Sequence, residues 1–173
     1  QEVLLQAESL ADTFRDMAER LAVSQRDTNA QVASSAQDIT SLAAQIAKIN
    51  ETIARTGESA GGILTLQDEQ SVLVRQLSEI VDIDVLQRAD GGVDITIGNG
   101  RALVIGENGY QLQVSAVAGV NQIFAAGVDI TAELSAGKIG GLIYARDVLL
   151  PGYQADLDAL AYEVVNNVNA LHA

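Results

Sequence analysis

The 173-residue sequence contains no cysteine and no tryptophan, and it has a single histidine and a single proline. Without cysteine, neither a disulfide nor a thiolate metal site can form. The lone His172 leaves histidine-based triads and histidine metal clusters without their other members. Aromatic residues make up only 3 % of the chain, so its core must be aliphatic, and pockets for flat ligands are not expected. We therefore expect no enzyme, no metal site and no cofactor.

Positive charge is also scarce, with 10 lysines and arginines against 23 acids and a net charge of −13. A chain with this balance offers no basic patch for the phosphates of nucleic acids. Anionic membrane surfaces would repel it, and no apolar run approaches the length of about 18 residues that could cross a bilayer. Neither nucleic acid nor membrane is an expected partner. Residues 57–137 contain eleven acids against three bases, the largest net negative charge of any part of the chain, which predicts a solvated middle.

Neither glycine nor proline occurs in the first 56 residues. Apolar residues recur there at alternating spacings of four and three, which predicts one helix over Glu2–Thr56 packed against other helices. Such a helix is about 80 Å long. Gly57 is placed to cap its end. The repeat is formed by Val3, Ala7, Leu10, Phe14, Met17 and Leu21, and then by Val32, Ser35, Ile39, Leu42, Ile46, Ile49 and Ile53.

The repeat has one irregularity, where Leu21, Ser24, Thr28 and Val32 are spaced three, four and four. Two successive spacings of four form a stutter, which relaxes the supercoil locally. The segment is either a weakly packed mid-section or a bend that a neighbouring subunit contacts. We take Ser24, Thr28 and Val32 as candidate subunit contacts, together with the glycines of the following turn, which are Gly57, Gly61 and Gly62.

Later segments alternate between helical and strand patterns. Thr65 and Asp68 form a capping box that predicts a second helix from Thr65, folded back antiparallel on the first. From Ile83 the apolar period becomes two, with Asp-Gly and Asn-Gly turns, which predicts an antiparallel meander of four to six strands. From Lys138 the pattern is helical again, and Pro151 predicts a kink near residues 145–149.

These patterns together predict an α+β fold. We expect an elongated antiparallel helical bundle of three main helices, formed by residues 1–81 and 138–173, and a small antiparallel β insert at residues 82–137. The chain begins and ends inside helical patterns, so we expect it to be a fragment of a longer protein. Asn50-Glu51-Thr52 has the form of a glycosylation sequon, but it lies within the long predicted helix.

Two segments resemble the flagellar hook-associated protein 1 family. The first is Leu66–Ser78, where Asp68, Leu73, Val74, Leu77 and Ser78 fit the family pattern D-Q-R-D-x-L-[VL]-x-x-L-S, although Gln70 and Ser71 replace its Arg and Asp. The second is Ile139–Ala173, which resembles the succession G-G-L-x-x-x-R-D-x-x-L-P, L-D-x-L-A and V-N-x-x-H. With the long leading helix, the resemblance extends over essentially the whole chain.

The resemblance implies an extracellular structural subunit of the bacterial flagellum, exported by the type III apparatus, that joins hook to filament. Its implied partners are copies of itself in a helical ring, the hook protein and the second junction protein, with an export chaperone binding a terminal segment outside this chain. The polymerisation segments of the family also lie outside it. Alternatives are another axial protein, such as flagellin or the second junction protein, and an adhesin-like stalk. For the stalk, Tyr110 and Phe124 are the aromatic residues that the insert offers.

Overall fold

The computed structural model describes the backbone of residues 2–56 and 60–172 and the side chains of residues 6–55 and 62–170. The chain forms two compact units. We call residues 1–29 and 144–173 the helix-pair unit, and residues 30–143 the mixed unit. The predicted boundaries of the β insert, residues 82–137, remain a prediction. Within the described residues, no helix combines the length and apolar character that a membrane crossing requires.

Helix α1 (Glu2–Thr56) runs for 55 residues, which confirms the long helix predicted from the sequence. Its second half belongs to the mixed unit, and Val32, Ile39, Ile46 and Ile53 are fully buried there at seven-residue spacing. The small residues Ala36, Ala43 and Ala47 are buried beside them, so neighbouring elements can pack closely against this face of the helix.

Helix α2 (Ala60–Ile80) begins one turn before the predicted start at Thr65. Ile63 and Leu66 are both half-buried and continue the apolar spacing toward the buried Leu77, so the earlier start buries one more turn of the same face. Thr65 is therefore not a cap but an exposed residue within the helix. The physical reason is that burial of the apolar face outweighs the modest preference of Thr for a cap.

The mixed unit holds two antiparallel sheets instead of the single meander of four to six strands that the sequence indicated. The first sheet has the order β1-β2-β3-β4, and the second has the order β5-β6-β7. The strand that the sequence did not predict is the two-residue pairing β4. The β3–β4 turn falls at 106–107 because Asn108 and Gly109 pair with Ile105 and Val104. The strands are β1 (Ile83–Gln87), β2 (Val93–Ile97), β3 (Arg101–Ile105), β4 (Asn108–Gly109), β5 (Leu112–Val117), β6 (Val120–Ala125) and β7 (Val128–Asp129).

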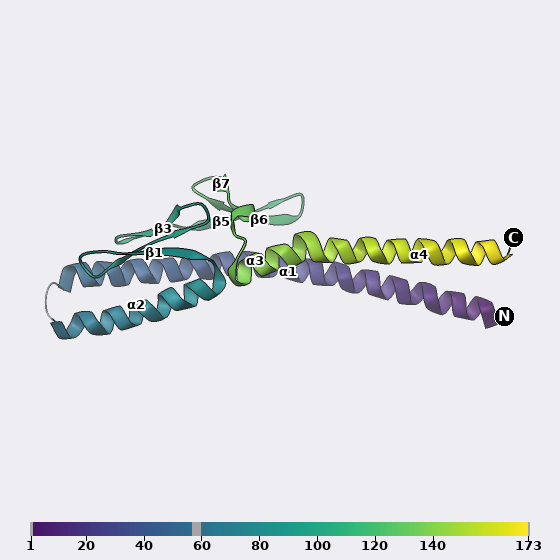
Figure 1. The fold of residues 1–173 in the computed structure, drawn as a ribbon, viewed down its shortest axis with the longest axis horizontal. Coiled ribbons are helices and arrows are strands. Elements are labelled where there is room, and N and C mark those ends of the chain that lie inside the picture. Colours follow the sequence, from purple (N-terminus) through teal and green to yellow (C-terminus); the bar gives the residue numbers. More distant parts are fainter. Residues whose placement is uncertain (1, 57–59, 173) are drawn as a thin grey trace. The chain divides into compact units, whose positions relative to one another are not determined.

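Both sheets lie on the same side of α1 (Figure 1). Thr40 Oγ1 accepts a hydrogen bond from the Leu112 backbone N–H at 3.1 Å, which links α1 to the start of β5. One core joins α1, α2, both sheets and α3 (Gly137–Tyr144). The larger buried residues of this core are Val32, Ile39, Ile46, Leu77, Val81, Val93, Ile95, Ile97, Leu103, Val104, Ile123, Ile130, Leu134 and Ile139.

The short 3₁₀ helix η1 (Thr131–Glu133) leads into α3. A π-helical segment, η2 (Ala145–Leu149), then joins α3 to α4 (Leu150–His172). The Leu150 N–H donates to the carbonyl of Ala145, one residue farther back than in an α-helix. Pro151 follows at once and has no N–H to donate, so the α-helical ladder is interrupted at this point. At residues 145–149, where the sequence predicted a kink, the structure has this π-helical segment.

Candidate interaction surface

In the helix-pair unit, α4 runs antiparallel to the first half of α1 (Figure 1). Each helix has a half-buried seam with alternating spacings of three and four, the arrangement expected for two helices packed along one stripe each. The seam residues are Ala11, Phe14, Ala18 and Leu21 on α1, and Leu150, Gln154, Leu157, Ala161 and Val164 on α4.

A second apolar stripe on each helix stays exposed. On α1, Leu10 and Met17 are 42 % and 48 % exposed. On α4, Tyr153 and Leu160 are 56 % and 53 % exposed. The apolar repeat predicted Leu10 and Met17 for the packed seam of α1, and that prediction is wrong for both residues. The reason is that two helices cover only one stripe on each other, and here the alanines of α1 occupy that stripe.

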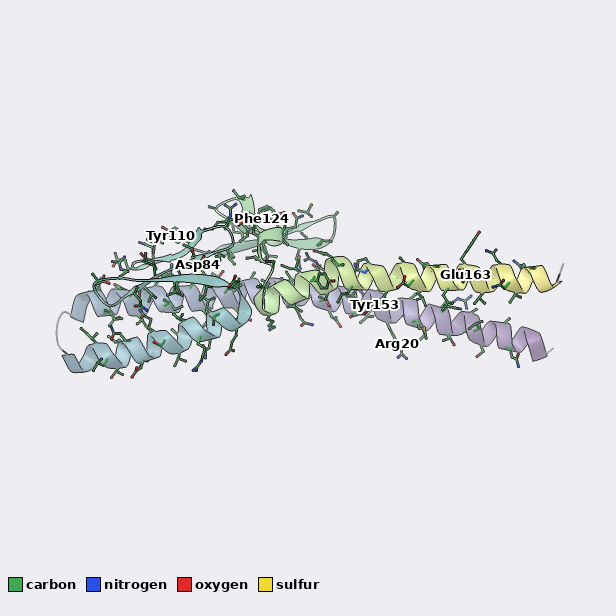
Figure 2. All side chains as sticks on the ribbon, viewed as in Figure 1. Arg20, Asp84, Tyr110, Phe124, Tyr153 and Glu163 are labelled. Atoms are coloured by element: carbon green, nitrogen blue, oxygen red, sulfur yellow. The ribbon has the colours of Figure 1, made fainter. Side chains whose placement is uncertain are left out.

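The exposed stripes border a groove between the two helices, which we call the α1–α4 groove. It has a volume of about 440 Å³. Arg20 on α1 and Tyr153 on α4 both line it, and both are labelled in Figure 2. Its full lining is Met17, Arg20 and Leu21 from α1, and Tyr153, Asp156, Leu157 and Leu160 from α4.

A second hollow, of about 360 Å³, lies between the N-terminal part of α1 and the C-terminal part of α4. Its walls are almost entirely apolar, and Leu10 and Phe14 of α1 face Val164 and Val168 of α4. Exposed aliphatic side chains gathered on one pair of helices are the usual mark of a protein contact surface.

Arg146 anchors the start of α4 within this unit. Its side chain is only 2 % exposed, Nε donates to Asp147 at 2.6 Å, and Nη1 donates to the Asn29 side chain of α1 at 3.3 Å. A buried guanidinium requires such partners because an unpaired buried charge is costly. The pair Arg146 and Asp147 is the R-D of the motif noted in the sequence, and the π segment η2 carries it.

The structure separates the predicted subunit contacts. Ser24 is exposed, whereas Thr28 is buried and its hydroxyl donates to the Ser24 carbonyl at 2.7 Å. Val32 is fully buried in the core of the mixed unit. A contact role for these residues remains a prediction, and burial leaves Ser24 as the accessible member.

Gly61 and Gly62 lie in the first turn of α2 and not in a loop, and Gly62 is exposed. Gly57 lies outside the described residues, and so does its predicted capping role. Contact through Gly61 or Gly62 remains a prediction.

The exposed stripe of α4 was not predicted from the sequence, although the seven-residue spacing of Tyr153 and Leu160 is visible there.

Two carboxylates of the mixed unit, those of Asp129 and Glu133, accept hydrogen bonds from residues of the same unit. Arg101 donates to both carboxylate oxygens of Glu133, at 3.0 and 3.1 Å, and this hydrogen bonding lowers the pKa of Glu133. The Thr131 hydroxyl and N–H donate to Asp129 and lower the pKa of its carboxyl.

Among the described residues, no three His, Cys, Asp or Glu side chains gather as a metal site would require. Tyr110 is exposed and Phe124 is half-buried (Figure 2).

Comparison with known proteins identifies the fold. Residues 1–173 match the family described as the flagellar hook-associated protein FlgK helical domain. The chain belongs to this family. It is 30 % identical over 184 residues to flagellar hook-associated protein 1 of Salmonella typhimurium, with 99 % of this chain and 33 % of that protein covered. It is also 30 % identical over 183 residues to the Escherichia coli K12 protein of the same name, with 99 % and 34 % covered.

A solved structure of the flagellar hook junction protein FlgK from Burkholderia pseudomallei is also similar to this chain. The TM-score is 0.77 at 28 % identity, with 90 % of this chain and 30 % of that chain covered. The chain thus spans about a third of the length of the curated relatives that it matches. Its long α1 and small antiparallel sheets are those of a FlgK helical domain.

Proposed function

We propose that the chain is the helical domain of a structural subunit that joins hook to filament in the bacterial flagellum, outside the cell. Membership of the FlgK helical-domain family supports this role, together with the name of the similar hook junction protein. The work of such a subunit is mechanical. It transmits load between neighbouring tubular assemblies through the packing of its helices, so it needs stiff elements and contact surfaces more than a reactive centre.

The observation that carries the proposal is the exposed apolar surface of the helix-pair unit. Met17, Tyr153 and Leu160 form the walls of the α1–α4 groove at roughly half exposure. In water these side chains favour burial, and covering the half that is still exposed gains roughly 1 kcal/mol for each. The chain as a whole carries a net charge of −13, which keeps it dispersed until a specific partner covers this surface.

The proposed partners are other copies of the subunit in a helical ring, the hook protein on one side and the second junction protein on the other. An export chaperone would bind a segment outside this chain. Exposed Ser24, near Met17 on α1, remains a proposed contact, as do Gly61 and Gly62.

The test uses the full-length protein in the bacterium that makes it. Deletion of its gene should leave hooks without filaments, seen by electron microscopy, and cells that do not swim. Restoring the gene with Met17→Lys and Leu160→Lys together should fail to restore filaments, because two charges would line the groove. The matched control is Val72→Lys on α2, since Val72 is exposed to a similar degree as Met17 but lies in the mixed unit.

Filaments that persist after deletion would refute the junction role. Filaments restored equally by the groove variant and by the wild-type gene would show that the groove is not a contact surface, even if the junction role stands. Immunoblots of the secreted fraction must show equal amounts of each variant, so that failed export is not mistaken for failed assembly.

A further inference from the structure

We propose that Asn99–Gly100, in the turn between β2 and β3, is a site of spontaneous deamidation, and that the neighbouring carboxylate of Glu133 slows the reaction. The inference goes beyond the proposed function and does not depend on it, because the reaction requires only water and the residues of the turn. It adds a covalent modification site to a chain whose role is otherwise mechanical.

Deamidation converts an asparagine to a carboxylate through the backbone that follows it. The backbone nitrogen of the next residue loses its proton to hydroxide and forms a bond to the asparagine side-chain carbon Cγ. The bond from Cγ to the amide nitrogen breaks, and this nitrogen takes a proton from water and leaves as ammonia. Water then opens the five-membered succinimide ring at either carbonyl, which gives aspartate or isoaspartate. Glycine favours the reaction when it follows the asparagine, because it has no side chain to hinder the ring closure.

The sequence contains two Asn-Gly pairs, Asn99–Gly100 and Asn108–Gly109, and both asparagines are exposed. Sequence alone therefore does not distinguish them. Ring closure requires rotation about the bond between the asparagine Cα and its carbonyl carbon, which moves the glycine that follows. The pair that reacts is the one whose backbone can make this rotation.

The backbone of Asn108–Gly109 is held on two sides. Asn108 pairs with Ile105 and Gly109 pairs with Val104, which joins β4 to β3. A Cβ built on Gly109 would lie 3.2 Å from the carbonyl oxygen of Ala43, so the backbone of α1 lies close behind it. Rotation at Asn108 would break the pairing and drive Gly109 against α1. The reaction there must wait for local opening of β4.

The backbone of Asn99–Gly100 has neither restraint. The two residues lie in the turn between Ile97 and Arg101, which are the last residues of the β2–β3 pairing. A Cβ built on Gly100 would meet nothing within 4 Å. Gly98 and Gly100 have positive φ of 53° and 80°, and the Gly100 N–H donates within the turn to the Gly98 carbonyl at 2.9 Å. Rotation here breaks one local bond and leaves the sheet intact.

Glu133 of η1 places a carboxylate against this turn. Arg101 donates to both of its oxygens, and the side chain and backbone of Asn99 also hydrogen-bond to it. A Cβ built on Gly98 would lie 3.0 Å from Glu133 Oε2. The Gly100 nitrogen becomes negative when it loses its proton, and a neighbouring carboxylate opposes that charge. Glu133 thus lowers the rate at Asn99 without blocking the rotation.

The product changes the contact between the turn and η1. The Asn99 amide that bonds to Glu133 is replaced by a second carboxylate, and like charges repel. In isoaspartate the former side-chain carbons become part of the main chain, so the turn also becomes longer. Either product weakens the link between the β2–β3 turn and η1.

The experiment is incubation of the purified chain in mildly alkaline buffer, followed by trypsin digestion and mass spectrometry. Trypsin cleaves after Arg101, so the two Asn-Gly pairs fall in different peptides. In the folded chain, Asn99 should convert at least about tenfold faster than Asn108, because Asn108 reacts only after the β3–β4 pairing opens. In concentrated urea the two rates should be similar, since glycine follows both asparagines and neither is then held. Circular dichroism checks that the chain in buffer stays folded.

Glu133→Gln tests the part played by the carboxylate. It should raise the rate at Asn99 by at least about threefold, because a neutral amide does not oppose the charge on the reacting nitrogen. The rate at Asn108 should stay unchanged in the same sample, which separates this effect from general loosening of the fold. Glu69→Gln is the matched control, since Glu69 is an exposed glutamate on α2 in the same unit, and it should leave both rates unchanged.

Conversion of Asn108 at the same rate as Asn99 in the folded chain, or faster, overturns the assignment of the site. An Asn99 that stays intact in the folded chain while it converts in urea overturns it as well. An unchanged rate at Asn99 in the Glu133→Gln variant overturns the role of Glu133. Each outcome is read from the purified chain, so it is distinguishable from failure of the junction role, which is read from filaments on cells.

Discussion

The side-chain amide of Asn50 binds the backbone of Val93 at both of its polar groups. Asn50 Nδ2 donates to the Val93 carbonyl at 2.7 Å, and Asn50 Oδ1 accepts from the Val93 N–H at 3.0 Å. Nδ2 also donates to the Gly106 carbonyl at 2.6 Å, and Gln70 of α2 donates to Oδ1 at 2.8 Å. One buried residue thus joins α1, α2, β2 and the β3–β4 turn. Asn50 is the first residue of a glycosylation sequon, but its side-chain amide is engaged in these hydrogen bonds within the core.

Asn50→Ala should therefore destabilise the chain by about 3 kcal/mol, because buried backbone groups of Val93 would lose their partners and the part-buried Gly106 carbonyl would lose its donor. Urea unfolding followed by circular dichroism measures this. Gln45→Ala is the matched control on the same helix, since Gln45 is exposed and bonds only to Ser41 one turn away, so its loss should cost less than about 0.5 kcal/mol. Equal midpoints for the two variants would contradict the role given to Asn50.

The adjacent glycines of the G-G-L motif should respond in opposite directions to alanine. A Cβ on Gly140 would lie 2.6 Å from the Ser135 carbonyl oxygen, whereas a Cβ on Gly141 would meet nothing within 4 Å. Gly140→Ala should cost at least about 2 kcal/mol through backbone displacement. Gly141→Ala should stabilise α3 by about 0.5–1 kcal/mol, because alanine has the better helix propensity. Thermal unfolding of both variants tests this, and equal shifts would refute the close approach at Gly140.

Two hairpin turns place alanine where asparagine fits better. Ala118 and Ala126 have φ of 50°, and each precedes a glycine that also has positive φ. Asparagine tolerates this region better than alanine does, and Asn-Gly is the preferred pair for such turns. Ala118→Asn and Ala126→Asn should each raise the free energy of unfolding by about 0.5 kcal/mol. Ala116→Asn, within β5, should lower it. A loss of stability at both turns would contradict the assigned turn geometry.

Stability should fall in acid partly through Asp129 and Glu133. Hydrogen bonds from Thr131 lower the pKa of Asp129, and those from Arg101 lower the pKa of Glu133, below ordinary values of 3.8 and 4.5. The folded state thus binds fewer protons than the unfolded state. This contribution is complete above the ordinary values and is lost as the pH falls through the lowered ones.

The double variant Asp129→Asn and Glu133→Gln cannot titrate at these sites. Its free energy of unfolding should therefore change less than that of the wild type between neutral pH and pH 3. The control is Asp84→Asn on the exposed strand β1, which should retain the wild-type slope. Parallel pH profiles for the double variant and the wild type would show that these carboxylates do not contribute.

Local sequence patterns were sufficient to predict the elements that are formed by residues close together in the chain. The absence of glycine and proline up to residue 56 and the spacing of Val32, Ile39, Ile46 and Ile53 define α1. Pro151 indicated the interruption that η2 forms. Turn residues located the hairpins, but not the division into two sheets or the pairing of Asn108 and Gly109, since two-residue strands carry no periodic signal.

The sequence by itself determined the long helix, the antiparallel hairpins, the acidic and aliphatic character, and the resemblance that the family match confirmed. Only the tertiary structure decided which of two apolar stripes on α1 and α4 is packed and which is exposed. The physical reason is that a helix with apolar residues over a wide arc can rotate about its axis without changing its own hydrogen bonds. The side chains of the neighbouring helix then select the stripe that it buries, and they leave Met17 and Leu160 exposed beside the groove.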